Sequence, residues 1–334
     1  MTGPAFVTGG SGFVGGAVLR RLVDTGREVR ALARSDDAAQ QVTRLGAEAV
    51  RGDLFDLEAL LEGMRGCTVV FNAAGVNATC LRDAGPMLHT NVEGAAVVVR
   101  AAAAAGVARV VHTSSAATIG EARGAVGRED SPHRGSFLSA YERSKFLAER
   151  RALALGDELG VELVCVNPSS VQGPGRAEGS ARLLLELLTR RRPPVVDTWL
   201  SIVDVDDCAQ GHLLAEERGT VGARYLLNGA SLEVEEAVAL LRETSGRPAH
   251  VLRIPRPVVA AAGHLVGPIA RLVGRDPVLC EEVTRTLLHG HRFDGGRAER
   301  ELGLRYRPLR ETLERTLAWY EDQGLIAPIH PGVG

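Results

Sequence analysis

Strand-like and helix-like patterns alternate along the first two-thirds of this 334-residue chain. Short runs of β-branched and other apolar residues are each followed by a longer stretch with the periodicity of an amphipathic helix. Several of these runs are apolar throughout, which is typical of strands whose sheet is covered on both faces. The expected strands are Ala5–Thr8, Glu28–Ala33, Ala47–Arg51, Thr68–Ala73, Arg109–Ser114 and Glu162–Asn167, and the expected helices lie near 13–25, 36–45, 56–65, 86–105 and 139–159. The alternation predicts an α/β fold with a doubly wound parallel sheet, which binds its ligands at the carboxyl ends of the strands.

This rhythm changes after Asn167-Pro168, where prolines and glycines begin to interrupt the helical segments. We therefore expect two domains: a sheet domain over residues 1–168 and a smaller, mostly helical lobe over residues 169–330. Segments near 201–228 are expected to return to the main sheet, through strands at Ser201–Val203 and Tyr225–Asn228.

The composition excludes several classes of protein. Lys and Arg total 39 against 41 Asp and Glu, and the net charge of −2 gives no basis for binding nucleic acid or an anionic membrane. The longest apolar stretch, Val258–Val273, is interrupted by polar residues and falls short of a membrane span, so we expect it in the core of the lobe, with a membrane-facing or substrate-facing wall as the alternative. The 5 cysteines are scattered without metal-binding spacing, and three lie in apolar contexts. Since no signal peptide is expected before the first strand, we predict a cytoplasmic protein.

A glycine-rich turn follows the first expected strand. Gly9, Gly12 and Gly15 have the spacing G-x-x-G-x-x-G, and Phe13 and Val14 stand between the last two. Such glycines permit a tight turn and a close approach of the backbone to a pyrophosphate, which the exposed N–H groups of a helix N-terminus can bind. At the first strand–helix junction of a doubly wound sheet, this motif predicts a dinucleotide site and a Rossmann fold.

The end of the second expected strand bears on the choice of dinucleotide. Proteins that prefer NAD usually place an acidic residue here for the ribose 2′-hydroxyl, whereas this chain has Arg34. A guanidinium suits a 2′-phosphate, so NADP(H) is favoured and NAD(H) remains possible. Asp36 and Asp37 are expected to face solvent. The alternative is that Arg34 is only a solvated loop residue.

Two further strand ends are expected at the same edge. In Gly52-Asp53-Leu54, the carboxylate of Asp53 can accept a hydrogen bond from the adenine amino group, or alternatively cap the helix that starts near Asp56. Ala73, Ala74 and Gly75 end the fourth strand, where small residues let the backbone pass close to the cofactor.

The strongest catalytic pattern is the pair Tyr141 and Lys145. Residues four apart lie on the same face of a helix, and a nearby ammonium lowers the pKa of a tyrosine. Tyr141 is therefore predicted to be a general acid and base for a carbonyl or hydroxyl group. The fifth strand ends in Ser114 and Ser115, of which Ser115 is the first candidate to hold the reacting oxygen and Ser114 the second.

In their order, these motifs resemble those of the extended short-chain dehydrogenases/reductases, in the NAD-dependent epimerase/dehydratase branch. The chain looks most like the dihydroflavonol-4-reductase-like and hopanoid-associated sugar-epimerase-like members. The resemblance implies that Ser115, Tyr141 and Lys145 form a catalytic triad and that Lys145 also binds the nicotinamide ribose. It further implies that Pro168, Ser170 and Val171 line the nicotinamide end of the cofactor site.

Three functions are weighed for such a chain. The first is an NADP(H)-dependent oxidoreductase that interconverts a ketone and a secondary alcohol on a small molecule. The second is an NAD-dependent nucleotide-sugar epimerase or dehydratase, which an acidic residue in place of Arg34 would favour. The third is a catalytically silent NADP sensor, which would not need the serine, tyrosine and lysine.

Other features receive structural interpretations. Asn91 is expected to be a buried structural residue. No metal site is predicted, because His289 and His291 are two apart and would not share a helix face. The resemblance and the Ala- and Leu-rich helices near 86–105 and 139–159 lead us to expect a homodimer.

Overall fold

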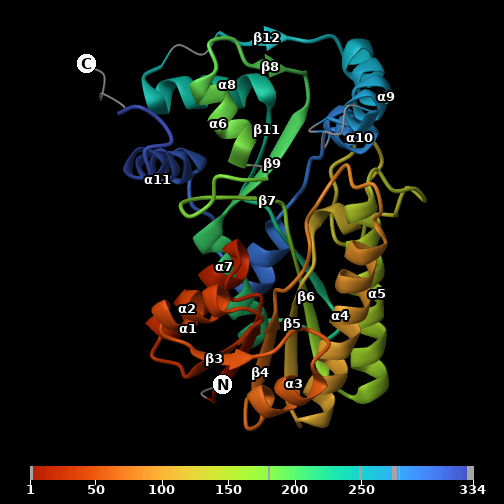
Figure 1. The fold of residues 1–334 in the computed structure, drawn as a ribbon, viewed down its shortest axis with the longest axis vertical. Coiled ribbons are helices and arrows are strands. Elements are labelled where there is room, and N and C mark those ends of the chain that lie inside the picture. Colours follow the sequence, from red (N-terminus) through yellow and green to blue (C-terminus); the bar gives the residue numbers. More distant parts are fainter. Residues whose placement is uncertain (1–2, 180, 248–249, 273–276, 278, 329–334) are drawn as a thin grey trace.

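The computed structural model describes residues 3–328 except 180, 248–249, 273–276 and 278. A seven-stranded sheet forms the body of the molecule, with the order β10-β6-β5-β4-β1-β2-β3 and parallel pairing throughout (Figure 1). Its strands are β1 (Ala5–Thr8), β2 (Val29–Ala33), β3 (Glu48–Arg51), β4 (Val69–Asn72), β5 (Arg109–Thr113), β6 (Glu162–Pro168) and β10 (Arg224–Leu227). The expected doubly wound parallel sheet is confirmed.

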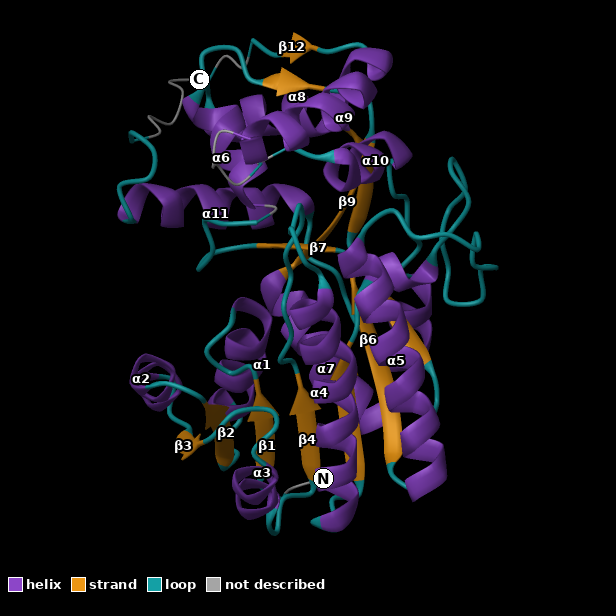
Figure 2. Ribbon diagram, turned by 45° about the vertical axis from the view of Figure 1, so that its right-hand side comes forward, coloured by secondary structure: helices purple, strands orange, loops and turns teal. Residues whose placement is uncertain are grey.

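Helices cover both faces of this sheet (Figure 2). The helices of the body are α1 (Phe13–Asp24), α2 (Asp36–Arg44), α3 (Leu57–Met64), α4 (Gly85–Ala104), α5 (Ala140–Leu159) and α7 (Val205–Arg218). Because successive side chains of a strand point to opposite faces, β1 contributes to two cores. Its Val7 packs in the core that contains Val18 of α1, while Phe6 packs in the other core with Leu60 of α3.

A smaller lobe lies beyond the carboxyl ends of the strands (Figure 1). It contains two small sheets with the strand orders β11-β9-β7 and β12-β8. Its core is built around Leu187, Val238, Leu241, Leu317 and the fully buried Tyr320. The elements outside the main sheet and its helices are η1 (Ala116–Ile119), β7 (Ser170–Gln172), α6 (Ala181–Thr189), β8 (Pro194–Val195), β9 (Trp199–Asp204), β11 (Ala230–Glu233), α8 (Val234–Ser245), β12 (Leu252–Arg253), α9 (Arg256–Leu272), α10 (Glu281–His289), η2 (Ala298–Leu302) and α11 (Leu309–Asp322).

Only one of the two segments expected to return to the main sheet does so. Strand β10 pairs with β6 and forms the edge of the main sheet. The prediction for Ser201–Val203 is wrong, because β9 pairs with β7 and β11 in the three-stranded sheet. Since β10 occupies the free edge of β6, no edge remains there for β9.

Helix α9 is also placed differently from the prediction. Several apolar residues of the stretch expected in the lobe core are exposed, among them Val258, Leu265 and Leu272. Helix α9 packs closely against α10, where a Cβ on Gly263 would overlap Thr284, and this contact covers only part of its surface. Val273, the last residue of that stretch, lies outside the described residues. Among the helices that the structure describes, none has the length and apolar character that crossing a membrane requires.

A disulfide bond links two distant parts of the chain. Cys80, in the loop after β4, is bonded to Cys280, the residue before α10, across 200 residues of sequence. Cys67, Cys165 and Cys208 are buried free thiols. The pairing of Cys80 with Cys280 was not predicted, because a separation of that length carries no spacing signal.

Candidate active site

The glycine-rich turn lies between β1 and α1. Gly9 has a φ of 72°, and a Cβ at this position would lie 2.7 Å from the backbone carbon of Ala73. A Cβ on Gly15 would overlap the carbonyl oxygen of Gly9. Gly12 begins the helix without a side-chain cap, and the first turn of α1 carries no acidic residue. The first N–H groups of this described helix are therefore available to an anion, as a dinucleotide pyrophosphate requires.

Arg34 is exposed at the carboxyl end of β2. The next residue, Ser35, caps α2 by accepting a hydrogen bond from the backbone nitrogen of Ala38 at 3.2 Å. Asp36 and Asp37 face solvent, as expected, and Asp36 forms an ion pair with Arg51 at 3.2 Å. Arg34 is thus exposed at the strand end where the sequence predicts a 2′-phosphate.

The alternative role of Asp53 as a helix cap is wrong. Asp56 caps α3 by accepting a hydrogen bond from the backbone nitrogen of Ala59 at 3.1 Å. Asp53 instead accepts one from the backbone nitrogen of Phe55 at 2.7 Å and is exposed. Leu54 is half-buried and lies against α4 at Gly94. The carboxylate of Asp53 therefore remains available at the adenine end of the predicted site.

Side-chain hydrogen bonds hold the backbone at the end of β4. Thr8 donates to the Asn72 side chain at 2.7 Å and accepts from the backbone nitrogen of Ala74 at 3.3 Å. Asn91 of α4 binds both backbone polar groups of Val76, accepting at 2.7 Å and donating at 2.9 Å. Asn91 is thus buried and structural, as predicted, and it fixes the loop that begins at Gly75.

The two serines after β5 point in different directions. The hydroxyl of Ser114 donates to the Glu149 carboxylate at 2.5 Å and is buried. Ser115 is half-buried, and its hydroxyl is close enough to the Tyr141 phenol to lower the pKa of that group. The geometry therefore favours Ser115 over Ser114 as the partner of a reacting oxygen.

Tyr141 lies in the first turn of α5, which Ser139 caps. Burial raises the pKa of Tyr141, while the hydrogen bond from Ser115 and the charge of Arg176 oppose this shift. The expected lowering of this pKa by Lys145 is not confirmed, because burial raises the pKa and Lys145 is not among the groups that oppose the shift. The Lys145 ammonium donates to the Thr113 carbonyl at 2.7 Å. Burial lowers the pKa of Lys145 to about 8, against the opposing charge of Glu149.

Lys145 also lies close to the end of β4. A Cβ built on Gly75 would be 3.8 Å from the Lys145 ammonium nitrogen. The ammonium is thus beside the backbone that was predicted to contact the cofactor. Tyr141, Lys145, Ser115 and the small residues after β4 come together at one edge of the sheet, next to the glycine-rich turn.

The residues after β6 line the same edge. Pro168 and Val171 are buried, Ser170 is half-buried, and the backbone of Ser169 donates to the Leu227 carbonyl at 2.9 Å. Ser170 and Val171 belong to β7, which pairs with β9. The segment predicted to line the nicotinamide end therefore connects the main sheet to the lobe.

Two residues near the site were missed by the sequence analysis. The Arg176 guanidinium lies 5.6 Å from the centre of the Phe13 ring and acts electrostatically on Tyr141. Glu149 binds Ser114, Thr118 and Asn167 and forms an ion pair with Arg224 at 3.1 Å. Arg176 stands in an irregular loop without a pattern, whereas Glu149 is four residues after Lys145 on the same helix face, a signal that could have been used.

Comparison with known proteins agrees with this geometry. Residues 5–227 match the model of the NAD dependent epimerase/dehydratase family. A Synechocystis sp. protein named "Putative dihydroflavonol 4-reductase" is 32% identical over 330 residues, which cover 96% of this chain and 95% of that protein. A Stigmatella aurantiaca protein named 4-hydroxy-2-methyl-3-oxo-4-farnesyl-3,4-dihydroquinoline-1-oxide ketoreductase is 38% identical over 267 residues, which cover 78% of each chain.

A solved structure, that of gox2253, has the same fold. It superposes with a TM-score of 0.84 and 30% identity, over 96% of this chain and 99% of that one. The fold, the glycine-rich turn and the relatives agree on one assignment: the chain belongs to the NAD-dependent epimerase/dehydratase family, within the extended short-chain dehydrogenases/reductases.

Proposed function

We propose that this protein is an NADP(H)-dependent oxidoreductase that interconverts a ketone and a secondary alcohol. The observation that carries the proposal is the position of the Ser115 hydroxyl, close enough to the Tyr141 phenol to act on its pKa, with Lys145 one helical turn further along α5. The name of the Stigmatella relative, a ketoreductase, supports a carbonyl substrate.

The side chains supply the proton chemistry of such a reaction. A ketone oxygen held by the Ser115 hydroxyl would lie within reach of the Tyr141 phenol, which donates a proton as the carbonyl is reduced. A raised pKa keeps the phenol protonated at neutral pH and therefore suits this direction of reaction. Lys145 would bind the ribose of the cofactor and so hold it beside Tyr141. The Glu149 carboxylate acts as a positioning group because it holds Ser114, next to Ser115.

The residues present fit a nicotinamide dinucleotide. The uncapped N-terminus of α1 suits the pyrophosphate, and exposed Arg34 suits a 2′-phosphate. Asp53 and Leu54 would contact the adenine, and Pro168, Ser170 and Val171 the nicotinamide end. When bound, the cofactor supplies or accepts the hydride.

A panel of ketones tests the proposed function. We expect purified protein to oxidise NADPH only when a ketone is added, with one alcohol formed per NADPH consumed. Absorbance of the reduced cofactor and chromatography of the product measure both quantities. Tightly bound NAD, together with epimerisation of a nucleotide sugar without net cofactor turnover, would contradict the reductase and support the epimerase.

Arg34→Ala tests the cofactor preference. We expect the parent protein to bind NADPH more tightly than NADH, and the variant to lose about 10–100-fold in NADPH affinity, since a hydrogen bond to a charged group contributes about 1.5–3 kcal/mol. NADH affinity should stay unchanged. Arg44→Ala, which removes the same charge from the far end of α2, is the matched control. Equal affinities of the parent protein for both cofactors, measured by calorimetry, would refute the preference.

We also propose a homodimer formed through α4 and α5. These helices lie side by side on one face of the sheet (Figure 2), and Phe146, Leu147 and Leu153 of α5 are only half-buried. Sedimentation equilibrium at micromolar concentration should give twice the chain mass, and a monomer would contradict the proposal.

The cytoplasmic location stays a prediction. The disulfide argues against it, because such bonds are rare in reducing compartments.

A further inference from the structure

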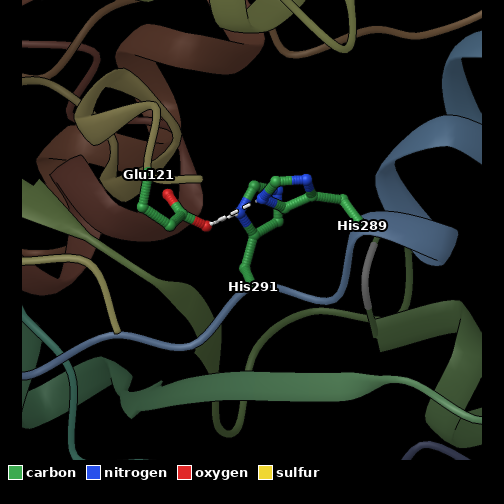
Figure 3. Close-up of side chains that lie close together, drawn as sticks. All are labelled: Glu121, His289 and His291. Atoms are coloured by element: carbon green, nitrogen blue, oxygen red, sulfur yellow. Dashed lines mark hydrogen bonds and ion pairs between the residues drawn. The ribbon is translucent and has the colours of Figure 1, made fainter. Parts of the chain in front are cut away.

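The side chains of two histidines and a glutamate point toward one another (Figure 3). Glu121 follows η1, at the end of the segment that begins with Ser115. One of its carboxylate oxygens lies 2.6 Å from Nδ1 of His291 and 3.2 Å from Nε2 of His289. Glu121 belongs to the main body, whereas His289 ends α10 and His291 follows that helix.

The backbone conformation explains why the spacing of His289 and His291 did not predict that their side chains meet. A continuous helix would place residues two apart on different faces. His289, however, is the last residue of α10, and Gly290 leaves the helix with a φ of 71°. The turn brings the two imidazole rings to a centre-to-centre distance of 4.8 Å. The assumption of a shared helix is therefore wrong for this pair.

The cluster is shielded from solvent. The exposed fractions of the side chains are 2% for Glu121, 6% for His289 and 17% for His291. The second oxygen of Glu121 is buried and has no hydrogen-bond partner among the described residues. The guanidinium of Arg134 donates to the backbone carbonyl of Glu121 but forms its ion pair with Glu142. Among the described residues, the side-chain partners of this buried carboxylate are therefore the two imidazoles, and both bind the same oxygen.

We propose that Glu121, His289 and His291 bind one divalent transition-metal ion of the zinc class. Imidazole nitrogen and carboxylate oxygen are ligands that Zn²⁺ prefers, and three protein ligands leave a fourth position for water. The three ligand atoms lie within 4.8 Å of one another. A tetrahedron with bonds of about 2.1 Å has edges of about 3.4 Å, so small side-chain rotations suffice.

The position of the site indicates what the ion does. The segment after Glu121 is already attached to the segment after His291, through hydrogen bonds between the backbones of Gly127 and Arg292 at 2.8 Å and of Asp294 and Gly127 at 3.0 Å. At the opposite end of α10, Cys280 is bonded to Cys80. An ion at His289 would fix the second end of α10 to the main body. The site therefore stabilises the attachment of the lobe to the main body.

Metal titration of the full chain tests this proposal. Protein without an affinity tag is treated with a chelator, desalted and titrated with Zn²⁺ by calorimetry and with Co²⁺ by visible absorption. We expect one ion per chain, a visible cobalt spectrum typical of a four-coordinate site, and a higher Tm with Zn²⁺. His291→Asn and Glu121→Gln should each weaken binding by at least about 100-fold, more than the loss of an outer-shell partner usually costs.

The control and the contrary outcomes are clear-cut. His89→Ala removes an exposed histidine outside the cluster and should bind Zn²⁺ like the parent protein. Circular dichroism shows whether each variant folds, and the parent titration alone decides the proposal if a variant does not. Absence of stoichiometric binding by the parent, or binding unchanged in both cluster variants, would overturn it. A Tm that depends on pH but not on Zn²⁺ would instead identify a hydrogen-bonded latch, and would also overturn it.

Discussion

Tyr141→Phe is expected to lower kcat by roughly 10²–10⁴-fold on any ketone that the parent protein reduces, because it removes a positioned proton donor. The substitution deletes one oxygen and keeps the ring in place in the first turn of α5. NADPH affinity and Tm should therefore stay close to those of the parent protein. Steady-state kinetics, cofactor titration and thermal unfolding measure the three quantities.

The neighbouring residues provide matched controls for this prediction. Ser115→Ala should reduce kcat more than Ser114→Ala, since the Ser115 hydroxyl acts on the Tyr141 phenol whereas that of Ser114 is bound to Glu149. Ser114→Ala should act mainly on stability, because it removes a donor to buried Glu149. Lys145→Met should lower both kcat and NADPH affinity. Full activity of Tyr141→Phe would show that the proton comes from another group, and our mechanism would be wrong.

Loss of the disulfide is expected to lower the free energy of unfolding by up to about 5 kcal/mol. In the chain-entropy model, a cross-link that closes a long loop restricts the unfolded chain strongly, and here the bonded residues are 200 apart. Cys80→Ser combined with Cys280→Ser should therefore unfold at a lower urea concentration than the parent protein. Because the bond also fixes the loop after β4, the same variant should show faster proteolysis of that loop.

Adding a reductant separates the effect of breaking the disulfide bond from the effect of replacing the two cysteine side chains. Adding it should shift the urea midpoint of the parent protein towards that of the double variant, and leave the variant unchanged. Thiol titration of the unfolded, unreduced parent protein should find the thiols of Cys67, Cys165 and Cys208 alone. Five reactive thiols and a midpoint insensitive to reductant would show that the bond does not form.

The sequence was most informative where local physics determines structure. Positions 9 and 15 of the first turn require glycine because a Cβ there would overlap the neighbouring backbone, and the sequence shows this requirement directly. Several strands of the main sheet are recognisable because burial on both faces selects continuous apolar runs. Once the strands were placed, parallel pairing brought Ser115 and the residues after β4 to one edge.

The sequence was least informative where long-range contacts decide. The hydrogen bond of Ser114 to Glu149 separates it from Ser115, yet both serines look alike in sequence. The pairing of Cys80 with Cys280 depends on how the lobe docks. The exposure of α9 was missed because an apolar helix near a lobe has the same pattern whether or not a partner covers it. The positive φ of Gly290 ends α10 and brings the rings of His289 and His291 together, whereas a continuous helix would have kept them apart.

The last strand of the main sheet has a consequence for how this protein is made. Strand β10 pairs along β6, but it is encoded after β7, α6, β8, β9 and α7. During synthesis, a sheet built from residues 1–168 would hold β6 as an open edge, with unpaired backbone groups that can recruit another chain. Glu149 of α5 would also be buried without its ion-pair partner Arg224, the first residue of β10. The nucleotide-binding half, although continuous in sequence for six of its strands, therefore cannot mature until the ribosome has passed through part of the lobe.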